Sequence, residues 1–134
     1  MQGDCLCGAV RITISKPLDY AEYCHCRSCR RATGAPVMAW ACVRRDAVKV
    51  EGDALRQFES TPGVQRTFCG ECGTSLTFWA RESAETLYVA VAALEDAESC
   101  APDFHIWRSD RLSWIDAMDG LPRYLRFKRD GLLE

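Results

Sequence analysis

The segment Arg66-Thr67-Phe68-Cys69-Gly70-Glu71-Cys72-Gly73 begins within one short stretch with the character of a β-strand, residues 64–68, and leads to a second, residues 76–78. Its two cysteines are three positions apart and fall where the chain turns from one stretch to the next. Thiolates at this spacing can chelate one metal ion, because both sulfurs can reach the same point in space. The segment therefore predicts a β-hairpin whose turn supplies part of a metal site.

The rest of the chain carries further short strand patterns. Residues 10–14 and 48–51 alternate apolar and polar side chains, as strands with one buried face do. Residues 37–43 and 86–94 are apolar runs rich in valine and alanine, which fit more deeply buried strands. These patterns predict a mainly β fold.

Helical patterns are rare. Only residues 28–33, which Gly34 and Pro36 follow, have the pattern of a short helix with a clear end. Residues 104–124 mix tryptophans with a Leu-Pro pair, and we expect them to form an irregular cover on the core.

Length and composition are those of one ordinary globular domain. The chain has 134 residues, 48% hydrophobic and 27% charged, so we expect a single domain over residues 1–134. The net charge of −2 offers no general attraction to nucleic acids or anionic membranes. The longest apolar stretches, residues 37–43 and 87–94, are much shorter than the roughly 20 residues of a membrane-spanning helix. Because the N-terminus has no secretory signal pattern, we expect a cytoplasmic protein. From the net charge and the short apolar stretches, we expect no nucleic-acid or membrane partner.

Cysteine is the unusual feature, with nine residues in this short chain. An odd number in a reducing compartment argues against a disulfide framework and favours metal binding. Seven of the nine fall into three tight groups, which scattered core cysteines would not do. The groups are Cys5-x-Cys7, Cys24-x-Cys26-x-x-Cys29 and Cys69-x-x-Cys72.

The seven cysteines divide naturally into four and three. Glycine follows Cys7 and Cys72, where a positive φ lets the backbone wrap around an ion, whereas Arg30 follows Cys29. We therefore pair Cys5 and Cys7 with Cys69 and Cys72 in a closed, structural zinc site. The remaining three, Cys24, Cys26 and Cys29, would leave one position for water or substrate, as catalytic zinc sites do. Two Zn²⁺ per chain are expected.

Four other residues could supply the fourth ligand of the three-cysteine zinc, and each also has an interpretation that involves no metal. Cys42 lies in an apolar run and favours core packing. Cys100 precedes Ala-Pro and is expected to be an unreactive thiol in a loop. His25 stands between two proposed ligands, where it would donate a hydrogen bond to a zinc-bound group or serve a structural role. His105 is expected to be a hydrogen-bonded histidine near Trp107.

Three arginines, Arg27, Arg30 and Arg31, surround the three-cysteine group. They are either a solvated basic turn or a clamp for an anionic thiol. Seven thiolates and two Zn²⁺ would change the net charge from −2 to −5, so nearby cations are expected.

The three cysteine segments together resemble one known family. Residues 3–8, 24–34 and 66–73 are similar to the motifs of the glutathione-dependent formaldehyde-activating enzymes, a family that also includes centromere protein V-like proteins. Weaker matches are His105-Ile106, Trp114 and Gly120-Leu121-Pro122, so the resemblance covers residues 3–124.

The resemblance implies an Mss4-like β-tent, in which small antiparallel sheets are joined by zinc. It implies the same division of ligands, with Cys5, Cys7, Cys69 and Cys72 structural and Cys24, Cys26 and Cys29 catalytic. It also implies a carbon–sulfur lyase activity that forms or cleaves S-hydroxymethylglutathione, a thiol adduct of glutathione and formaldehyde.

Two other functions are weighed against this one. The first is a zinc-stabilised binding module without catalysis, which would have no reason to leave an open zinc position. The second is a dithiol oxidoreductase using Cys69 and Cys72, which the absence of a thioredoxin-like βαβ pattern disfavours.

Overall fold

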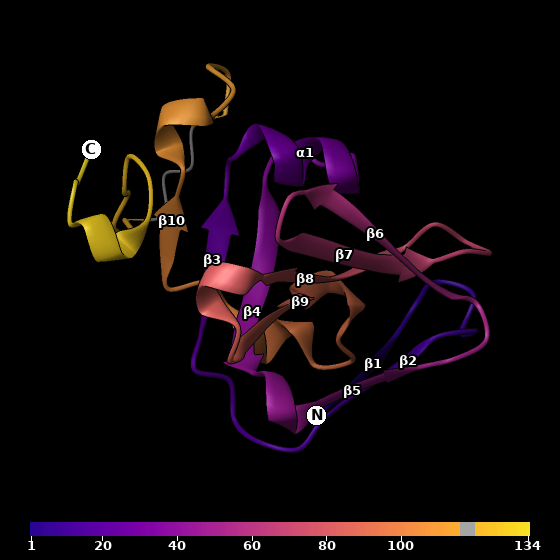
Figure 1. Cartoon of the computed structure of the whole chain (residues 1–134). Coiled ribbons are helices and arrows are strands. Elements are labelled where there is room, and N and C mark those ends of the chain that lie inside the picture. Colours follow the sequence, from indigo (N-terminus) through magenta and orange to yellow (C-terminus); the bar gives the residue numbers. More distant parts are fainter. Residues whose placement is uncertain (116–119) are drawn as a thin grey trace.

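The computed structural model describes residues 1–115 and 120–134, which form two β-sheets with short helices at their edges (Figure 1). The smaller sheet has the strand order β1-β2-β5 and the larger one β10-β3-β4-β9-β8-β7-β6. The strands are β1 (Gln2–Asp4), β2 (Arg11–Ile14), β3 (Tyr20–Cys24), β4 (Met38–Arg44), β5 (Val48–Glu51), β6 (Leu55–Thr61), β7 (Val64–Cys69), β8 (Ser75–Ala80), β9 (Thr86–Ala90) and β10 (Phe104–Ile106).

Nearly all strand pairs are antiparallel, as expected for short strands joined by tight turns. The exception is β10, which runs parallel to β3 and pairs Ile106 with Cys24. The mainly β fold of antiparallel sheets predicted from the sequence is confirmed.

One α-helix and six 3₁₀-helices complete the described part of the chain. Helix α1 begins directly after Cys26, whose sulfur accepts a hydrogen bond from the Cys29 N–H at 3.2 Å, and it ends at Gly34 in the left-handed conformation. The helices are α1 (Arg27–Thr33), η1 (Arg45–Ala47), η2 (Arg81–Ser83), η3 (Val91–Ala93), η4 (Ala97–Cys100), η5 (Arg108–Asp110) and η6 (Lys128–Asp130).

The predicted strands are present, with one shortened. The patterns at residues 10–14, 37–43, 48–51, 64–68 and 76–78 correspond to β2, β4, β5, β7 and β8. The strand predicted over residues 86–94 was wrong at its end, because β9 stops at Ala90 and the chain turns into η3. This turn brings Leu94 to a β-bridge with Gly3, so the small sheet is tied to the large one.

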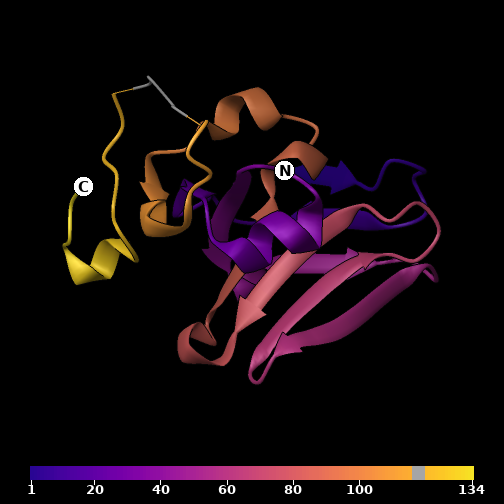
Figure 2. The same ribbon diagram turned by 90° about the horizontal axis from the view of Figure 1, so that it is seen from above.

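The C-terminal part of the chain is more regular than predicted. Within residues 104–124, expected to be irregular, β10 joins the large sheet, while residues 116–119 lie outside the described residues. His105 forms a parallel bridge with Arg123, and Tyr124 an antiparallel one with Leu133. Figure 2 shows this segment beside β10, on the opposite side of the molecule from the β6–β7 hairpin. Among the described helices, none is long and apolar enough to cross a membrane.

Candidate metal centres and adjoining cavity

The turns after β1 and β7 bring four cysteines together. We call Cys5, Cys7, Cys69 and Cys72 the four-cysteine cluster, and their sulfurs all lie within 4.8 Å of one another. Gly8 and Gly73 have φ of 80° and 78°, the left-handed conformation predicted for the residue after each pair. The Val10 and Cys72 N–H groups donate to the sulfurs of Cys5 and Cys69 at 3.2 and 3.5 Å. The local backbone is therefore arranged around the sulfurs.

The spacing of these sulfurs fits one tetrahedral zinc ion. Four sulfurs at about 2.3 Å from a zinc ion lie about 3.8 Å from each other. The Cys7 sulfur is 3.6 Å from that of Cys5 and 3.8 Å from that of Cys69. A hydrogen bond from the Thr74 hydroxyl lowers the pKa of Cys72 to about 5, which favours the thiolate that metals bind. None of the nine cysteines, all in the described part of the chain, forms a disulfide bond.

A three-cysteine cluster forms where β3 passes into α1. Cys24 ends β3, Cys26 caps α1 and Cys29 lies in its first turn, so one short segment presents all three sulfurs within 4.8 Å of one another. Cys24 and Cys29 are each only 3% exposed, and Cys26 is half-buried. Three convergent thiols are a donor set that suits zinc and leaves one of its four positions available.

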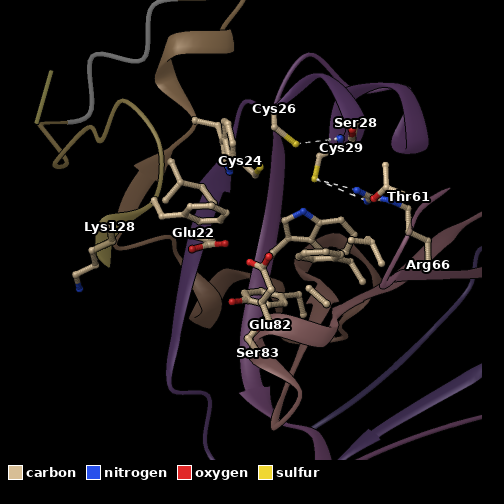
Figure 3. Close-up of a pocket in the computed structure, with 18 of the residues that line it drawn as sticks. Glu22, Cys24, Cys26, Ser28, Cys29, Thr61, Arg66, Glu82, Ser83 and Lys128 are labelled. Carbon is tan, nitrogen blue, oxygen red and sulfur yellow. Dashed lines mark hydrogen bonds between the residues drawn. The ribbon is translucent and has the colours of Figure 1, made fainter. Parts of the chain in front are cut away.

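Arg66 is the residue that sequence analysis missed at this cluster. It comes from β7, is 5% exposed, and its two terminal nitrogens lie 3.7 and 3.8 Å from the Cys29 sulfur (Figure 3). Hydrogen bonds from Cys24 and Cys26, followed by the Arg66 charge, lower the pKa of Cys29 well below its usual range. Cys29 is thus the thiol of this cluster whose ionised form is favoured, whereas the same coupling raises the pKa values of Cys24 and Cys26.

All three cysteines of this cluster line one large cavity of about 940 Å³. The turn between β6 and β7, η2, η6 and the start of α1 supply the rim, so segments far apart in the sequence form it. Glu22 and Cys24 both come from β3 and both line the cavity (Figure 3). Burial raises the pKa of Glu22 to about 8, and the neighbouring Cys29 adds to this effect. The four-cysteine cluster does not line this cavity.

The three predicted arginines are not equivalent in the structure. Arg27 is exposed and lines the cavity. Arg30 instead donates to the backbone carbonyls of His25 and Asp110, at 3.1 and 3.0 Å. Arg31 is exposed on α1 and is absent from the cavity lining. The basic surface toward the cavity comes from Arg27 together with Arg66, Arg81, Lys128 and Arg129.

The remaining candidates for the open position at the three-cysteine cluster belong to neither group of converging sulfurs. His25 and His105 are fully buried and face each other, with 2.9 Å between Nε2 of His25 and Nδ1 of His105. Burial, aided by Arg108, lowers the pKa of His25 to about 4. Cys42 is buried in β4, as predicted. Cys100 is also buried, in η4 rather than in an open loop, and its thiol donates to the Asp96 carbonyl.

The fold and the two sulfur clusters define a mainly β protein with two candidate metal centres, one of which lines a cavity. A sequence profile described as glutathione-dependent formaldehyde-activating enzyme matches residues 1–110. The chain belongs to this family, as the cysteine motifs indicated.

Individual relatives agree with this assignment. The chain is 32% identical over 77 residues to an uncharacterised lyase of Schizosaccharomyces pombe, a match of 58% of this chain and 56% of that protein. It is 34% identical over 76 residues to a Podospora anserina protein provisionally named as a glutathione-dependent formaldehyde-activating enzyme, over 54% of this chain and 36% of that protein. The matches thus span about half or less of these two relatives.

A solved structure supports the fold. The crystal structure of a Rhodobacter sphaeroides protein from structural genomics superposes with a TM-score of 0.60 and 31% sequence identity. The match covers 72% of this chain and 89% of the other.

Proposed function

We propose that this protein is a zinc-dependent carbon–sulfur lyase that forms or cleaves the adduct of a small anionic thiol and an aldehyde, such as S-hydroxymethylglutathione. One observation carries the proposal: Cys24, Cys26 and Cys29 converge at the wall of a large cavity, whereas the four-cysteine cluster lies elsewhere. A cluster that only stabilised the fold would not need access to a cavity. We further propose two zinc ions per chain, a single domain over residues 1–134 and a cytoplasmic location.

The proposed roles divide the residues between the two clusters. Cys5, Cys7, Cys69 and Cys72 would hold a structural zinc ion, and Cys24, Cys26 and Cys29 a catalytic one. When bound at the three-cysteine cluster, zinc would favour the ionised form of a substrate thiol at neutral pH. This is the state from which sulfur attacks an aldehyde carbon.

The side chains around the cluster would hold the substrate and balance its charge. Arg66 presents two N–H groups to the Cys29 sulfur from a buried position, so it offsets the negative charge of the thiolates. Arg27, at the rim of the same cavity, is placed to bind a carboxylate of the thiol.

The experiment that tests the proposal measures exchange between ¹³C-formaldehyde and its glutathione adduct by NMR, with and without the zinc-loaded protein. We expect the protein to accelerate the exchange, and Cys26→Ser or removal of zinc to abolish the acceleration. Cys100→Ser is the matched control, because Cys100 lies outside both clusters. If the zinc-loaded protein fails to accelerate exchange above the uncatalysed rate, a zinc-stabilised binding module becomes the better description.

A further inference from the structure

An aromatic wall, formed by Trp40, Phe78, Tyr88, Tyr20 and Phe104, lines the cavity next to the three-cysteine cluster. It begins at the sulfur site, because the guanidinium of Arg66 lies 5.1 Å over the ring of Phe78 and also faces the Cys29 sulfur. The ring centroid of Phe78 is 5.9 Å from that of Trp40 and 4.9 Å from that of Tyr88.

The wall continues from Tyr88 through Tyr20 to Phe104. The hydroxyl oxygens of Tyr88 and Tyr20 are 3.5 Å apart, and the ring centroid of Tyr20 is 5.2 Å from that of Phe104. Burial raises the pKa of both tyrosines, so their hydroxyls stay neutral. Cations lie at the two ends of the wall, because Lys128 Nζ is 4.5 Å from the ring centroid of Phe104 and Arg66 lies over Phe78. Neutral aromatic side chains, with Phe78, Tyr88 and Tyr20 open to the cavity, thus lead away from the three-cysteine cluster.

The aromatic wall offers contacts that the reacting carbon of a formaldehyde adduct does not use. The carbon that formaldehyde adds to sulfur bears only a hydroxyl group, which is small and polar. The peptide groups of glutathione need hydrogen-bond partners, which ring faces do not supply. The cavity of about 940 Å³ is near the upper end of the range of about 300–1,000 Å³ for ligand sites. Its size and its wall therefore fit a ligand with a large apolar group.

We propose that the cavity accepts thiol adducts whose reacting carbon carries an aromatic or similarly bulky apolar group, as thiohemiacetals of aromatic aldehydes do. This inference rests on the proposed function and names the aldehyde class. In the cleavage direction the carbon–sulfur bond breaks, its electron pair stays on sulfur, the hydroxyl proton leaves to solvent and the aldehyde is released. No oxidant or reductant is needed.

The positions of the charged and aromatic side chains distinguish the two parts of such an adduct, the thiol and the apolar group from the aldehyde. Arg27 and Arg81 line the rim of the cavity, where a carboxylate of the thiol half would bind. The part of the aromatic wall open to a ligand is formed by Tyr20, Phe78 and Tyr88, which are half-buried, and the buried Trp40 and Phe104 support it from behind. The thiol half would therefore point to the rim and the apolar half along the wall.

Two stable thioethers test the inference without relying on turnover. Isothermal titration calorimetry compares S-benzylglutathione with S-methylglutathione on the zinc-loaded protein, since they differ only in the group that would contact the wall. We expect the benzyl compound to bind at least tenfold more tightly. Equal affinity, or weaker binding of the benzyl compound, would overturn the inference.

A variant that fills the cavity provides the second arm. Ser83 and Tyr88 both line the cavity, so Ser83→Trp would place a large ring beside the wall. We expect Ser83→Trp to remove most of the preference for the benzyl compound. Ser113→Trp, at an exposed position outside the cavity lining, is the matched control and should keep it. Ser83→Leu is a smaller change that should reduce the preference if Ser83→Trp does not fold.

The outcomes distinguish this inference from the proposed function. Accelerated formaldehyde exchange with no preference for the benzyl compound would refute the aldehyde class alone. A clear benzyl preference in a protein that accelerates no exchange with formaldehyde or benzaldehyde would refute the lyase and support only the apolar ligand site.

Discussion

The two terminal nitrogens of Arg66 lie 3.7 and 3.8 Å from the sulfur of Cys29, although the two residues are 37 positions apart in the sequence. This contact joins the β7–β8 hairpin, which also carries half of the four-cysteine cluster, to the segment that carries the three-cysteine cluster. Because Arg66 is buried, its charge acts on the sulfur with little screening by solvent. The two candidate metal centres are therefore linked through one strand.

The contact predicts that Arg66 supports the three-cysteine cluster by its charge. Arg66→Ala should weaken metal binding there by about 10- to 100-fold, which corresponds to the loss of a charged contact of about 1.5–3 kcal/mol. Arg66→Lys should restore part of the affinity, because the charge is kept and the paired N–H geometry is lost. Competition with a chromophoric chelator measures the affinity, and the Co²⁺–thiolate absorption bands report the cluster directly.

Arg56→Ala is the control for this series, because Arg56 is exposed on β6 and bonds only to backbone carbonyls. If Arg66→Ala and Arg56→Ala bind metal equally well and give the same Co²⁺ spectrum, Arg66 has only a packing role on Phe78.

The sequence carries clear information about the hairpin and little about the cavity. Residues 64–78 predicted β7 and β8 because strand patterns flank the cysteine pair, and the glycines after Cys7 and Cys72 predicted the observed turns. Strand β6 was not predicted, because most of its side chains are exposed and no apolar alternation marks it. Strand β10 has three residues, and its partner β3 lies about 80 positions earlier. Its pairing depends on tertiary contacts rather than on local pattern.

The role of Arg66 was hidden for a related reason. A charged residue within a short strand is ordinarily placed on the solvent side, and only the fold reveals that Arg66 points inward. The nearby arginines of residues 27–31 were the more obvious candidates. In the structure Arg30 donates hydrogen bonds to two backbone carbonyls. No pattern in the sequence indicates these bonds.

The second prediction separates the two metal centres by their effect on stability. Structural zinc contributes about 10–16 kcal/mol to folding, against typical net stabilities of about 5–15 kcal/mol. Cys72→Ser should therefore unfold the protein, because the four-cysteine cluster joins segments more than 60 positions apart. Circular dichroism and elemental analysis of the purified variant provide the measurement.

Cys26→Ser is the comparison, and its expected behaviour is different. Its cluster spans only residues 24–29, so metal binding there closes a short loop and supports less of the fold. We expect this variant to remain folded, to bind about one zinc ion fewer and to lose activity. Unfolding as complete as that of Cys72→Ser would mean that the second centre is also structural.

The third prediction concerns recognition of the thiol's carboxylate. Arg27 and Arg31 are both exposed arginines of α1, but only Arg27 lines the cavity. Arg27→Ala should weaken binding of glutathione by about tenfold, the loss of one charge-assisted contact. Arg31→Ala should leave the affinity within a factor of two. Calorimetry on zinc-loaded protein makes the comparison, and equal effects of the two changes would assign both residues to a general surface charge.

The last prediction concerns the segment that carries Phe127 into the cavity lining. Arg108 is 4% exposed, and its Nε donates to the Glu134 carboxylate at 2.9 Å. This contact, with a smaller one from Arg111, lowers the pKa of Glu134. A lowered pKa in the folded state adds stability above the ordinary range of glutamate, and that stability is lost as the pH falls through the lowered pKa.

Glu134→Gln should therefore reduce the stability of residues 120–134 at pH 7 by about 1–3 kcal/mol, because the buried Arg108 charge loses its partner. Hydrogen exchange of these residues measures the local free energy of opening. The difference from wild type should shrink in acid, where the wild-type carboxylate is also neutral. Glu85→Gln is the control, since Glu85 is 81% exposed in its pair with Arg44 and should have little effect. A loss of local stability that is the same at pH 7 and in acid would show that Glu134 acts by packing rather than by charge. The ion pair with Arg108 would then not stabilise the C-terminal side of the cavity.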